Sequence, residues 1–349
     1  MAGKTLLVVG GYGVVGEQLV TMFAARNPGV RLLIGGRTRD RAQALADRLP
    51  AAAAVTIDVM DEDPLAALTE PVDGVVVAVN DHRDRLLTAA LARGLPLVDI
   101  ARWTTRIDDA RAIVGSQSRS PVVLASGWMA GAVATVVAAF ADGQTADHVD
   151  IDILFGAADK AGPDSVAGFV NMHQPFGIYE HGTFRMVRSL TDGRTRRFPL
   201  GQSAKVRRFS APDQNSLIAS GIAKGVAMRM AFDSAALMGG FTAMVRSGLW
   251  GRLPVTLREK LLHNPGAGDA HQVVITAIFP QYRVMVAMVD KLGQTHMTAA
   301  GGVSQAERLL GLRGRLFPPL GVSYPEMASD VAVEPASLGE MGVELTTWS

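Results

Sequence analysis

Three glycines near the N-terminus have a spacing that suits dinucleotide binding. Gly11, Gly13 and Gly16 form the pattern G-x-G-x-x-G within the stretch LLVVGGYGVVGEQLV. In this pattern the first glycine allows a tight turn, the second lets the backbone approach a pyrophosphate, and the third allows a helix to pack closely on a strand. A helix beginning near Val14 would direct its free N–H groups and its positive dipole end at the phosphates. We therefore expect the pyrophosphate to lie against Gly11, Tyr12, Gly13, Val14, Val15 and Gly16.

The residues after the second expected strand indicate which dinucleotide is bound. An acidic side chain about 20 residues beyond the glycines would hold the ribose 2′-hydroxyl of NAD. The segment GGRTRDR stands there instead, and its arginines can pair with a 2′-phosphate. A solvated helix start would also account for Arg39 and Arg41. The sequence favours NADP(H), held at this end by Gly36, Arg37, Thr38 and Arg41.

The elements around these residues predict a Rossmann-type fold. The apolar run TLLVVG precedes the glycines, and EQLVTMFAARN follows them with helical spacing of apolar residues. Further apolar runs, VRLLIGG, AAVTIDV, DGVVVAVN, LPLVDI and PVVLAS, alternate with helix-compatible segments. This alternation predicts an α/β fold with a doubly wound parallel sheet. The same context favours a dinucleotide-binding turn over a glycine-rich turn without a ligand.

Ligands of such sheets bind at the carboxyl ends of the strands, so the residues after each strand are further candidates. Those that we expect to contact the cofactor are Asp58, Val59, Val79, Asn80 and Arg102. Asp99, at the end of the fifth strand, is a candidate proton donor. An aspartate in that position also often caps the following turn.

A change of pattern near Asp147 predicts a second, α+β domain on a mostly antiparallel sheet. We expect a nucleotide domain at 1–146, completed by 297–349, and a substrate and dimerisation domain at 147–296. Long apolar helices beside an open sheet favour a homodimer.

Three segments carry the expectations for the second domain. HVDIDILFGA alternates as a strand with one buried face does. TFRMVRSLTDGRTRRFPL suggests two strands joined at Asp192-Gly193. The Ala- and Met-rich stretch 221–250 suggests a long helical region broken at Gly239-Gly240, with its methionines in the core.

The segment NMHQPFGIYEHGTF holds the densest group of titratable side chains. His173, Tyr179 and His181 fall in a stretch that also contains Pro175 and Gly177, which favours a loop. Loops over a cofactor cleft often supply groups that move protons, so these three are candidate catalytic residues. The alternative interpretation is that these three are surface residues beside a hairpin, without a catalytic role.

Composition excludes other classes of protein. The chain has 34 basic and 33 acidic residues and no basic stripe, which argues against nucleic acid as a partner. It has no cysteine and no H-E-x-x-H motif, so we expect no metal site and no thiol chemistry. The uncharged segment Pro121–Phe140 imitates a membrane span, but glycine, proline and serine interrupt it. With no signal-peptide pattern at the N-terminus, we expect a cytoplasmic protein without a membrane span.

The chain resembles the saccharopine dehydrogenase-like oxidoreductases. VVGGYGVVG with GGRTRDRAQALA is similar to the opening fingerprint of that family, and VVVAVN followed by ALARGLPLVDIA is similar to its next elements. HMTAAGGVSQAERLLG and PPLGVSYPEMA resemble its closing segments. The resemblance implies the family's scaffold and an NAD(P)-dependent oxidoreductase. Family members commonly have a G-x-D-P-G turn where this chain has Met129 and Ala130, which argues against an amino-dicarboxylate substrate.

Three functions agree with these observations. The leading hypothesis is an NADPH-dependent reductase of a C=N or other polarised double bond in a small or carrier-bound metabolite of specialised metabolism. A trans-acting enoyl reductase on a lipid or polyketide chain is the rival, and a long hydrophobic groove would favour it. The third is an NADP-binding sensor without catalytic activity.

Overall fold

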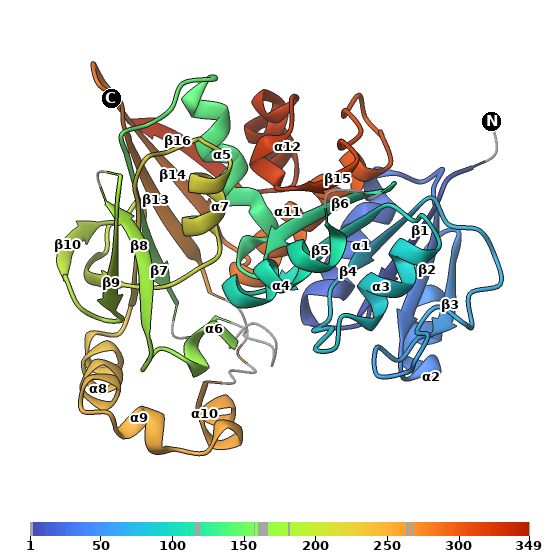
Figure 1. Cartoon of the computed structure of the whole chain (residues 1–349), viewed down its shortest axis with the longest axis horizontal. Coiled ribbons are helices and arrows are strands. Elements are labelled where there is room, and N and C mark those ends of the chain that lie inside the picture. The colour runs from blue at the N-terminus through green and yellow to red at the C-terminus, as the bar shows by residue number, and fades with distance from the viewer. Residues whose placement is uncertain are drawn as a thin grey trace. The chain divides into compact units, whose positions relative to one another are not determined.

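The protein divides into two compact units. The computed structural model describes residues 3–115, 119–156, 158–159, 167–180, 182–262, 266 and 269–348 (Figure 1). The first unit comprises Met1–Ala132 and Thr298–Asp330, and the second comprises Val133–Met297 and Val331–Ser349.

These limits differ from the expected domain limits in two places. Helix α5 (Ala132–Ala141), expected in the nucleotide domain, belongs almost entirely to the second unit. The C-terminal segment completes the first unit only as far as Asp330, because the last strand, β16 (Glu344–Trp348), pairs with β14 (Arg283–Asp290) of the second unit. Residues 331–349, which we expected in the nucleotide domain, therefore belong to the second unit.

The first unit is a Rossmann-type unit, as the alternating pattern predicts. Its sheet has the order β15-β6-β5-β4-β1-β2-β3, and these strands pair parallel to one another. The first six strands coincide with the six apolar runs of the sequence. The strands are β1 (Thr5–Val9), β2 (Arg31–Gly36), β3 (Ala52–Thr56), β4 (Gly74–Val77), β5 (Leu97–Arg102), β6 (Pro121–Ser126) and β15 (Gly321–Ser323).

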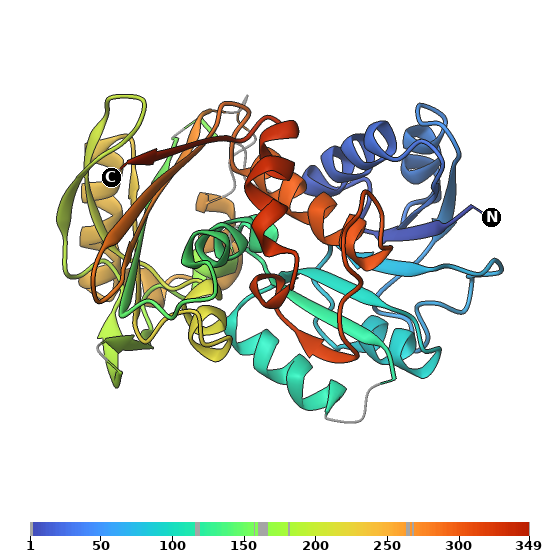
Figure 2. The same ribbon diagram turned by 90° about the horizontal axis from the view of Figure 1, so that it is seen from above.

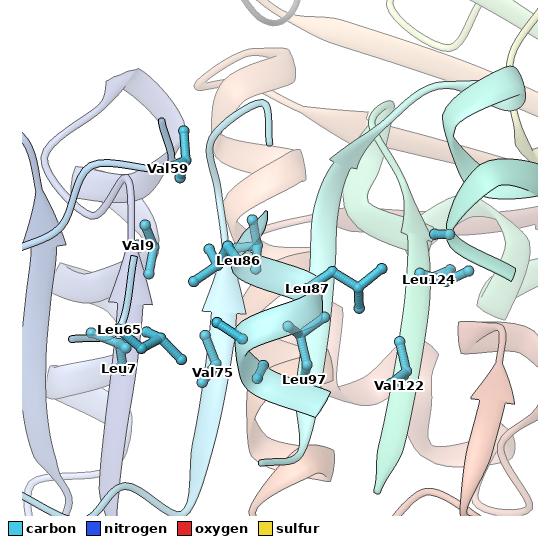
Figure 3. Packing of buried hydrophobic residues seen from close by; sticks show 14 of the residues in the cluster. Leu7, Val9, Val59, Leu65, Val75, Leu86, Leu87, Leu97, Val122 and Leu124 are labelled. Carbon is cyan, nitrogen blue, oxygen red and sulfur yellow. The ribbon is translucent and has the colours of Figure 1, made fainter. Parts of the chain in front are cut away.

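Helices cover this sheet and bury its continuous apolar runs. Figure 3 shows Leu7 and Val9 of β1 and Val75 of β4 on the face that carries Leu86 and Leu87 of α3. Every residue of β1 and β4 is buried, whichever face of the sheet it lies on, because both faces of a parallel sheet are covered. The helices are α1 (Val14–Arg26), α2 (Arg39–Ala46), α3 (Arg85–Ala92), α4 (Thr104–Val114) and, from Thr298 onward, α11 (Gln294–Leu309).

The uncharged segment 121–140 is split between β6, a short 3-10 helix (Met129–Gly131) and α5. Among the described residues, no helix has the length and apolar character needed to cross a bilayer.

The second unit is built on a seven-stranded sheet of order β10-β11-β12-β7-β13-β14-β16. Its strands pair antiparallel except for β12 and β7, so the expectation of a mostly antiparallel sheet is confirmed. Figure 2 shows the dark red C-terminal strand beside the orange strands of this sheet. The remaining strands are β7 (His148–Phe155), β10 (Arg194–Arg197), β11 (Ser203–Arg208), β12 (Val226–Phe232) and β13 (His271–Ile278), with β8 (Pro175–Glu180) and β9 (Thr183–Arg188) as a separate two-stranded sheet.

Helices of the second unit connect and flank these strands. They are, besides α5, α6 (Ala167–Val170), α7 (Asp213–Ala219), α8 (Ala235–Arg246), α9 (Leu249–Arg252), α10 (Val255–Leu262) and α12 (Glu334–Glu340).

The expectation of one exposed face for strand β7 is wrong. Asp150 is 9% exposed and Asp152 is 0% exposed. Arginines from β10 and β12 cover the polar face: Arg194 contacts both carboxylates, at 2.8 Å and 2.7 Å, and Arg229 contacts Asp150 at 2.6 Å. An alternating sequence indicates which face of a strand is polar, but it does not show whether that face is exposed. In β7 the polar face is buried by ion pairing.

The expected hairpin at Asp192-Gly193 is also wrong. Strand β9 pairs with β8, and β10 pairs with β11. Asp192 does adopt a left-handed backbone, with φ of 47°. However, the residues before it already pair elsewhere, because Leu190 N–H donates to the Arg208 carbonyl and Arg208 N–H donates to the Thr191 carbonyl.

The expected helical region 221–250 contains a strand, a helix and the start of helix α9. Strand β12 places Met228 and Met230 in the core, and Met238 of α8 is buried too, so the core interpretation of the methionines is confirmed. Helix α8 continues through Gly239 and Gly240, which are exposed and have open space around them, so the expected break is absent there.

Candidate functional site

The glycine turn between β1 and α1 depends on two close backbone contacts. Gly10 has φ of 84°, and a Cβ there would lie 2.7 Å from the Ala78 carbonyl oxygen. A Cβ on Gly16 would lie 2.1 Å from the Gly10 carbonyl oxygen. The residue with the left-handed backbone is therefore Gly10, whereas the sequence assigned the tight turn to Gly11. The Gly10-Gly11 doublet was the only signal for it.

Helix α1 begins directly after this turn, at Val14. Gly13 precedes the helix with an extended backbone, and its own N–H donates to the Gly10 carbonyl at 2.9 Å. The opening N–H groups of a helix, here those of Val14, Val15 and Gly16, have no acceptor within the helix. Together with the helix dipole they make a site for an anion. The turn also lies where β1 adjoins both β2 and β4, the point at which strand order reverses and dinucleotides bind in this fold.

Tyr12 fastens the glycine turn to the end of β2. Its hydroxyl oxygen accepts from the Thr38 N–H at 2.9 Å, and the Arg41 guanidinium lies over its ring at 4.7 Å. A Cβ on Gly36 would meet the ring at 2.2 Å, so the close approach of the tyrosine requires glycine there. Four residues that the sequence assigned to the cofactor are thus brought together.

The charges around this corner are mostly positive. Arg37 and Arg41 are exposed, and Asp40 stands in the first turn of α2. Arg39 is separate, because it lines a surface depression of about 280 Å³ with Leu33 of β2. The corner therefore offers Arg37 and Arg41 to an anion.

The other cofactor candidates follow β3 and β4 on the same edge. Asp58 accepts from the Met60 N–H at 2.9 Å, so its carboxylate holds the loop after β3. Val59 is buried in the core, while Val79 and Asn80 are half-buried after β4. Their contacts with a cofactor stay a prediction.

Asp99 and Arg102 belong to a buried ion-pair network at the end of β5. Arg102 Nε donates to Asp99 at 2.5 Å, and its Nη1 donates to Asp84 at 2.5 Å. Arg106 Nη2 also donates to Asp84, at 2.8 Å. Burial raises the pKa of the Asp99 carboxyl, against the opposing pull of Arg102. Both predicted site residues are thus engaged with each other, which leaves Asp99 poorly placed as a free acid.

This network also shapes the loop after β4. Asp81 caps α3 by accepting from the N–H groups of Arg85, Leu86 and Leu87. Asp84 has a left-handed backbone with φ of 55°. Sequence reasoning did not single out Asp84 or Arg106; the closely spaced charges of DHRD were the available signal.

The turn after β6 has an unusual backbone. Met129, Ala130 and Gly131 have φ values of 58°, 49° and 82°, and a Cβ on Gly131 would lie 2.4 Å from Pro325 Cγ. Non-glycine residues in this conformation concentrate at functional sites. The buried Nε1 of Trp128 has no hydrogen-bond partner in the part of the chain that the structure describes. This turn occupies the position where the family resemblance predicted an acid.

The proton-donor candidates of the second unit are held differently from one another. His173 packs its ring against Gly251 and places Nδ1 3.3 Å from Arg258 Nη1, so α9 and α10 hold it. Tyr179 is 39% exposed on β8, with its ring against that of Phe184. Its segment is a strand of a hairpin, whereas we expected a loop. His181 lies outside the described residues.

His271, which the sequence did not single out, is a fully buried histidine at the start of β13. Its ring packs on that of Phe155 with centroids 5.0 Å apart. Neither ring nitrogen has a hydrogen-bond partner in the structure as described. Burial lowers the pKa of His271 to about 3.

Comparison with known proteins supports the interpretation of the first unit. Residues 6–144 match the family model of the saccharopine dehydrogenase NADP binding domain. No curated protein sequence matches the chain.

Solved structures resemble the whole chain. Apo saccharopine dehydrogenase (L-Glu forming) from Saccharomyces cerevisiae has a TM-score of 0.63 and 11% identity, and the match covers 99% of this chain and 100% of that one. Amine dehydrogenase from Mycobacterium smegmatis has a TM-score of 0.46 and 11% identity, with 93% and 96% covered. Scyllo-inositol dehydrogenase from Lactobacillus casei has a TM-score of 0.46 and 10% identity, with 99% and 98% covered. At these identities the similarity to saccharopine dehydrogenase shows a shared fold. The other two structures, with TM-scores of 0.46, are too dissimilar to support a conclusion.

Proposed function

Because residues 6–144 match the family model of the saccharopine dehydrogenase NADP binding domain, we propose that the protein is an NADPH-dependent oxidoreductase. The proposed reaction is reduction of a C=N or other polarised double bond in a small or carrier-bound metabolite. The cofactor would supply a hydride, and the protein would orient the substrate carbon toward it. The observation that carries the proposal is the corner formed by Tyr12, Gly36 and Arg41.

This corner supports NADPH over NADH for an electrostatic reason. The end of β2 carries Gly36 and Arg37 where an NAD enzyme would carry an acid for the ribose hydroxyls. Arg41 is held in place by the ring and the carbonyl of Tyr12. A guanidinium restrained in this way loses less conformational freedom when it pairs with a phosphate.

The proton donor stays a separate prediction. Among the candidates, Tyr179 presents an exposed ring, whereas His173 contacts Arg258 and Asp99 contacts Arg102. Tyr179→Phe should therefore lower turnover more than His173→Gln or Asp99→Asn, with NADPH affinity unchanged.

Fluorescence titration of the full chain with NADPH and NADH tests the cofactor assignment. We expect Arg37→Glu and Arg41→Glu each to weaken NADPH binding about 100-fold, since a hydrogen bond to a charged group contributes about 1.5–3 kcal/mol and the reversal adds repulsion. NADH binding should change little.

Arg39→Glu is the matched control, because this arginine belongs to the same turn but faces the depression near Leu33. Equal losses for both cofactors would remove the phosphate assignment. If the wild-type chain formed no saturable complex with NADPH or NADP⁺, the proposed function itself would be wrong.

One observation favours the enoyl reductase as a second candidate. Helices α8–α10 expose several large apolar side chains, which would suit a long acyl chain: Leu237, Leu249, Val255, Leu257 and Leu261. Turnover that rises with the acyl chain length of the substrate would favour it over the imine reductase. Tight NADPH binding with no turnover on either class would favour the sensor.

A further inference from the structure

A cavity of about 300 Å³ lies at the β15 edge of the first unit, beneath the loop that joins α11 to β15. Its lining combines polar and apolar side chains, and the apolar ones include Leu316, Phe317 and Met327, which are 53%, 53% and 49% exposed. The volume is at the lower end of the range for small-molecule sites, roughly 300–1,000 Å³. Large apolar side chains that remain accessible around a cavity are suited to the apolar part of a ligand.

A buried amide gives this cavity a directional polar group. Gln305 of α11 lines it and is 1% exposed. Its Oε1 accepts from Arg308 Nη1 at 2.6 Å, and because arginine has only donors, the amide oxygen must face the guanidinium. The amide nitrogen is therefore the free end, and it has no hydrogen-bond partner within the described ranges.

The positions of Gln305 and Arg308 are set by the surrounding structure. Arg308 Nε donates to Asp330 at 3.0 Å, and Arg315 Nε donates to the other oxygen of the same carboxylate at 2.8 Å. These contacts hold α11 to Asp330, which directly follows the cavity-lining segment 323–329. An unsatisfied buried donor costs about 1–3 kcal/mol, so an acceptor brought to Gln305 would recover free energy.

We propose that this cavity binds an acyl group: a carbonyl or carboxylate oxygen accepts from the Gln305 amide, and a short aliphatic chain packs on Leu316, Phe317 and Met327. Cationic head groups are disfavoured, because Gln305 and Arg308 present donors and positive charge at the same end of the cavity. The site is separate from the glycine turn, since β15 is four strands from β1 in the sheet, or roughly 19 Å at the usual strand spacing. It does not depend on the proposed cofactor.

Octanoate and octanamide are the probes, with octylammonium as the negative control, each titrated into the full chain by calorimetry. We expect both acyl probes to bind, and the difference between them reports whether the natural head group is charged. Leu316→Ala should weaken binding about fivefold, because it removes part of the apolar wall. Leu320→Ala is the matched control: this leucine of the same loop is 67% exposed and does not line the cavity, so its replacement should leave binding unchanged.

Gln305→Glu tests the polar contact while keeping an acceptor for Arg308. It replaces the free donor by a carboxylate oxygen, so both acyl probes should bind about tenfold more weakly while the midpoint of thermal unfolding is retained. The proposal is overturned if neither probe binds the wild type, if Leu316→Ala and Leu320→Ala behave alike, or if octylammonium binds as tightly as octanoate.

Discussion

The two sheets of this protein bury their strands by different physical means. In the first unit, β1 and β4 are fully buried and apolar at every position except Thr5, and helices cover both faces. In the second, β7 is equally buried but carries Asp150 and Asp152 on one face. There, arginines from β10 and β12 neutralise the carboxylates, and hydrogen bonds from His148 and Arg194 hold the pKa of Asp150 well below its usual value although burial alone would raise it.

This difference shows where local sequence patterns are informative. A strand buried by apolar packing is visible in its own residues. A strand buried by ion pairing depends on charges from segments distant in the chain, so its own sequence resembles that of a half-exposed strand.

The largest effect is expected from breaking the ion pairs of the second sheet. Asp152→Ala leaves Arg194 and Arg196 without the carboxylate that they contact at 2.7 Å and 2.6 Å. Removing one partner of a buried ion pair costs about 3–5 kcal/mol. Urea denaturation should show a loss of this size in the free energy of unfolding. Glu17→Ala, which breaks the exposed pair with Arg48, should cost less than about 1 kcal/mol. Similar losses for the two variants would contradict the contrast between the sheets.

In the first unit, we expect the largest effect on NADPH binding from replacing Gly16, where the backbone packs closely. Gly16→Ala places a Cβ 2.1 Å from the Gly10 carbonyl oxygen, a backbone atom that cannot move without changing the turn. We expect NADPH to bind about 100-fold more weakly, or about 2.7 kcal/mol. Gly29→Ala, whose Cβ would meet nothing within 4 Å, is the control for glycine replacement in the same unit. Unchanged NADPH affinity in Gly16→Ala would show that the turn does not bind the pyrophosphate.

His271 should give the second unit a pH dependence that the apolar core of the first unit lacks. Its folded-state pKa of about 3 lies below the ordinary value near 6.5, so the unfolded chain takes up a proton first as the pH falls. The free energy of unfolding should therefore decrease from about pH 6.5 toward pH 3, by about 2 kcal/mol at pH 5. His271→Leu should remove that decrease, measured as urea denaturation at pH 7 and pH 5. An equal decrease in the variant would assign the effect to other groups.

The fold of the first unit and its glycine turn could be predicted from sequence because their signals are local. The second unit could not be predicted in the same detail. Strand β12 is apolar at every position except Arg229, and its alanines and methionines also suit a helix, so only its pairing with β7 makes it a strand. The Asp99–Arg102 pair shows that site residues can also depend on contacts distant in the sequence. Both residue types suit a cofactor pocket. In the structure, however, Asp84 from another loop completes an ion-pair network with them.

The smallest expected effect concerns Tyr12. Either its hydroxyl or the Thr38 N–H could donate to the phosphate of NADPH, and replacing Tyr12 distinguishes the two. Its hydroxyl accepts from the Thr38 N–H, so its own proton is free to be donated outward beside Arg41. Tyr12→Phe keeps the ring under Arg41 and removes only this donor, so NADPH should bind about fivefold more weakly, or about 1 kcal/mol, with NADH unchanged. Tyr12→Leu also removes the ring and should cost more, since a cation–π contact contributes about 0.5–1 kcal/mol. Tighter NADPH binding by Tyr12→Phe would instead identify the released Thr38 N–H as the phosphate donor, and the tyrosine would then be a group that the cofactor displaces.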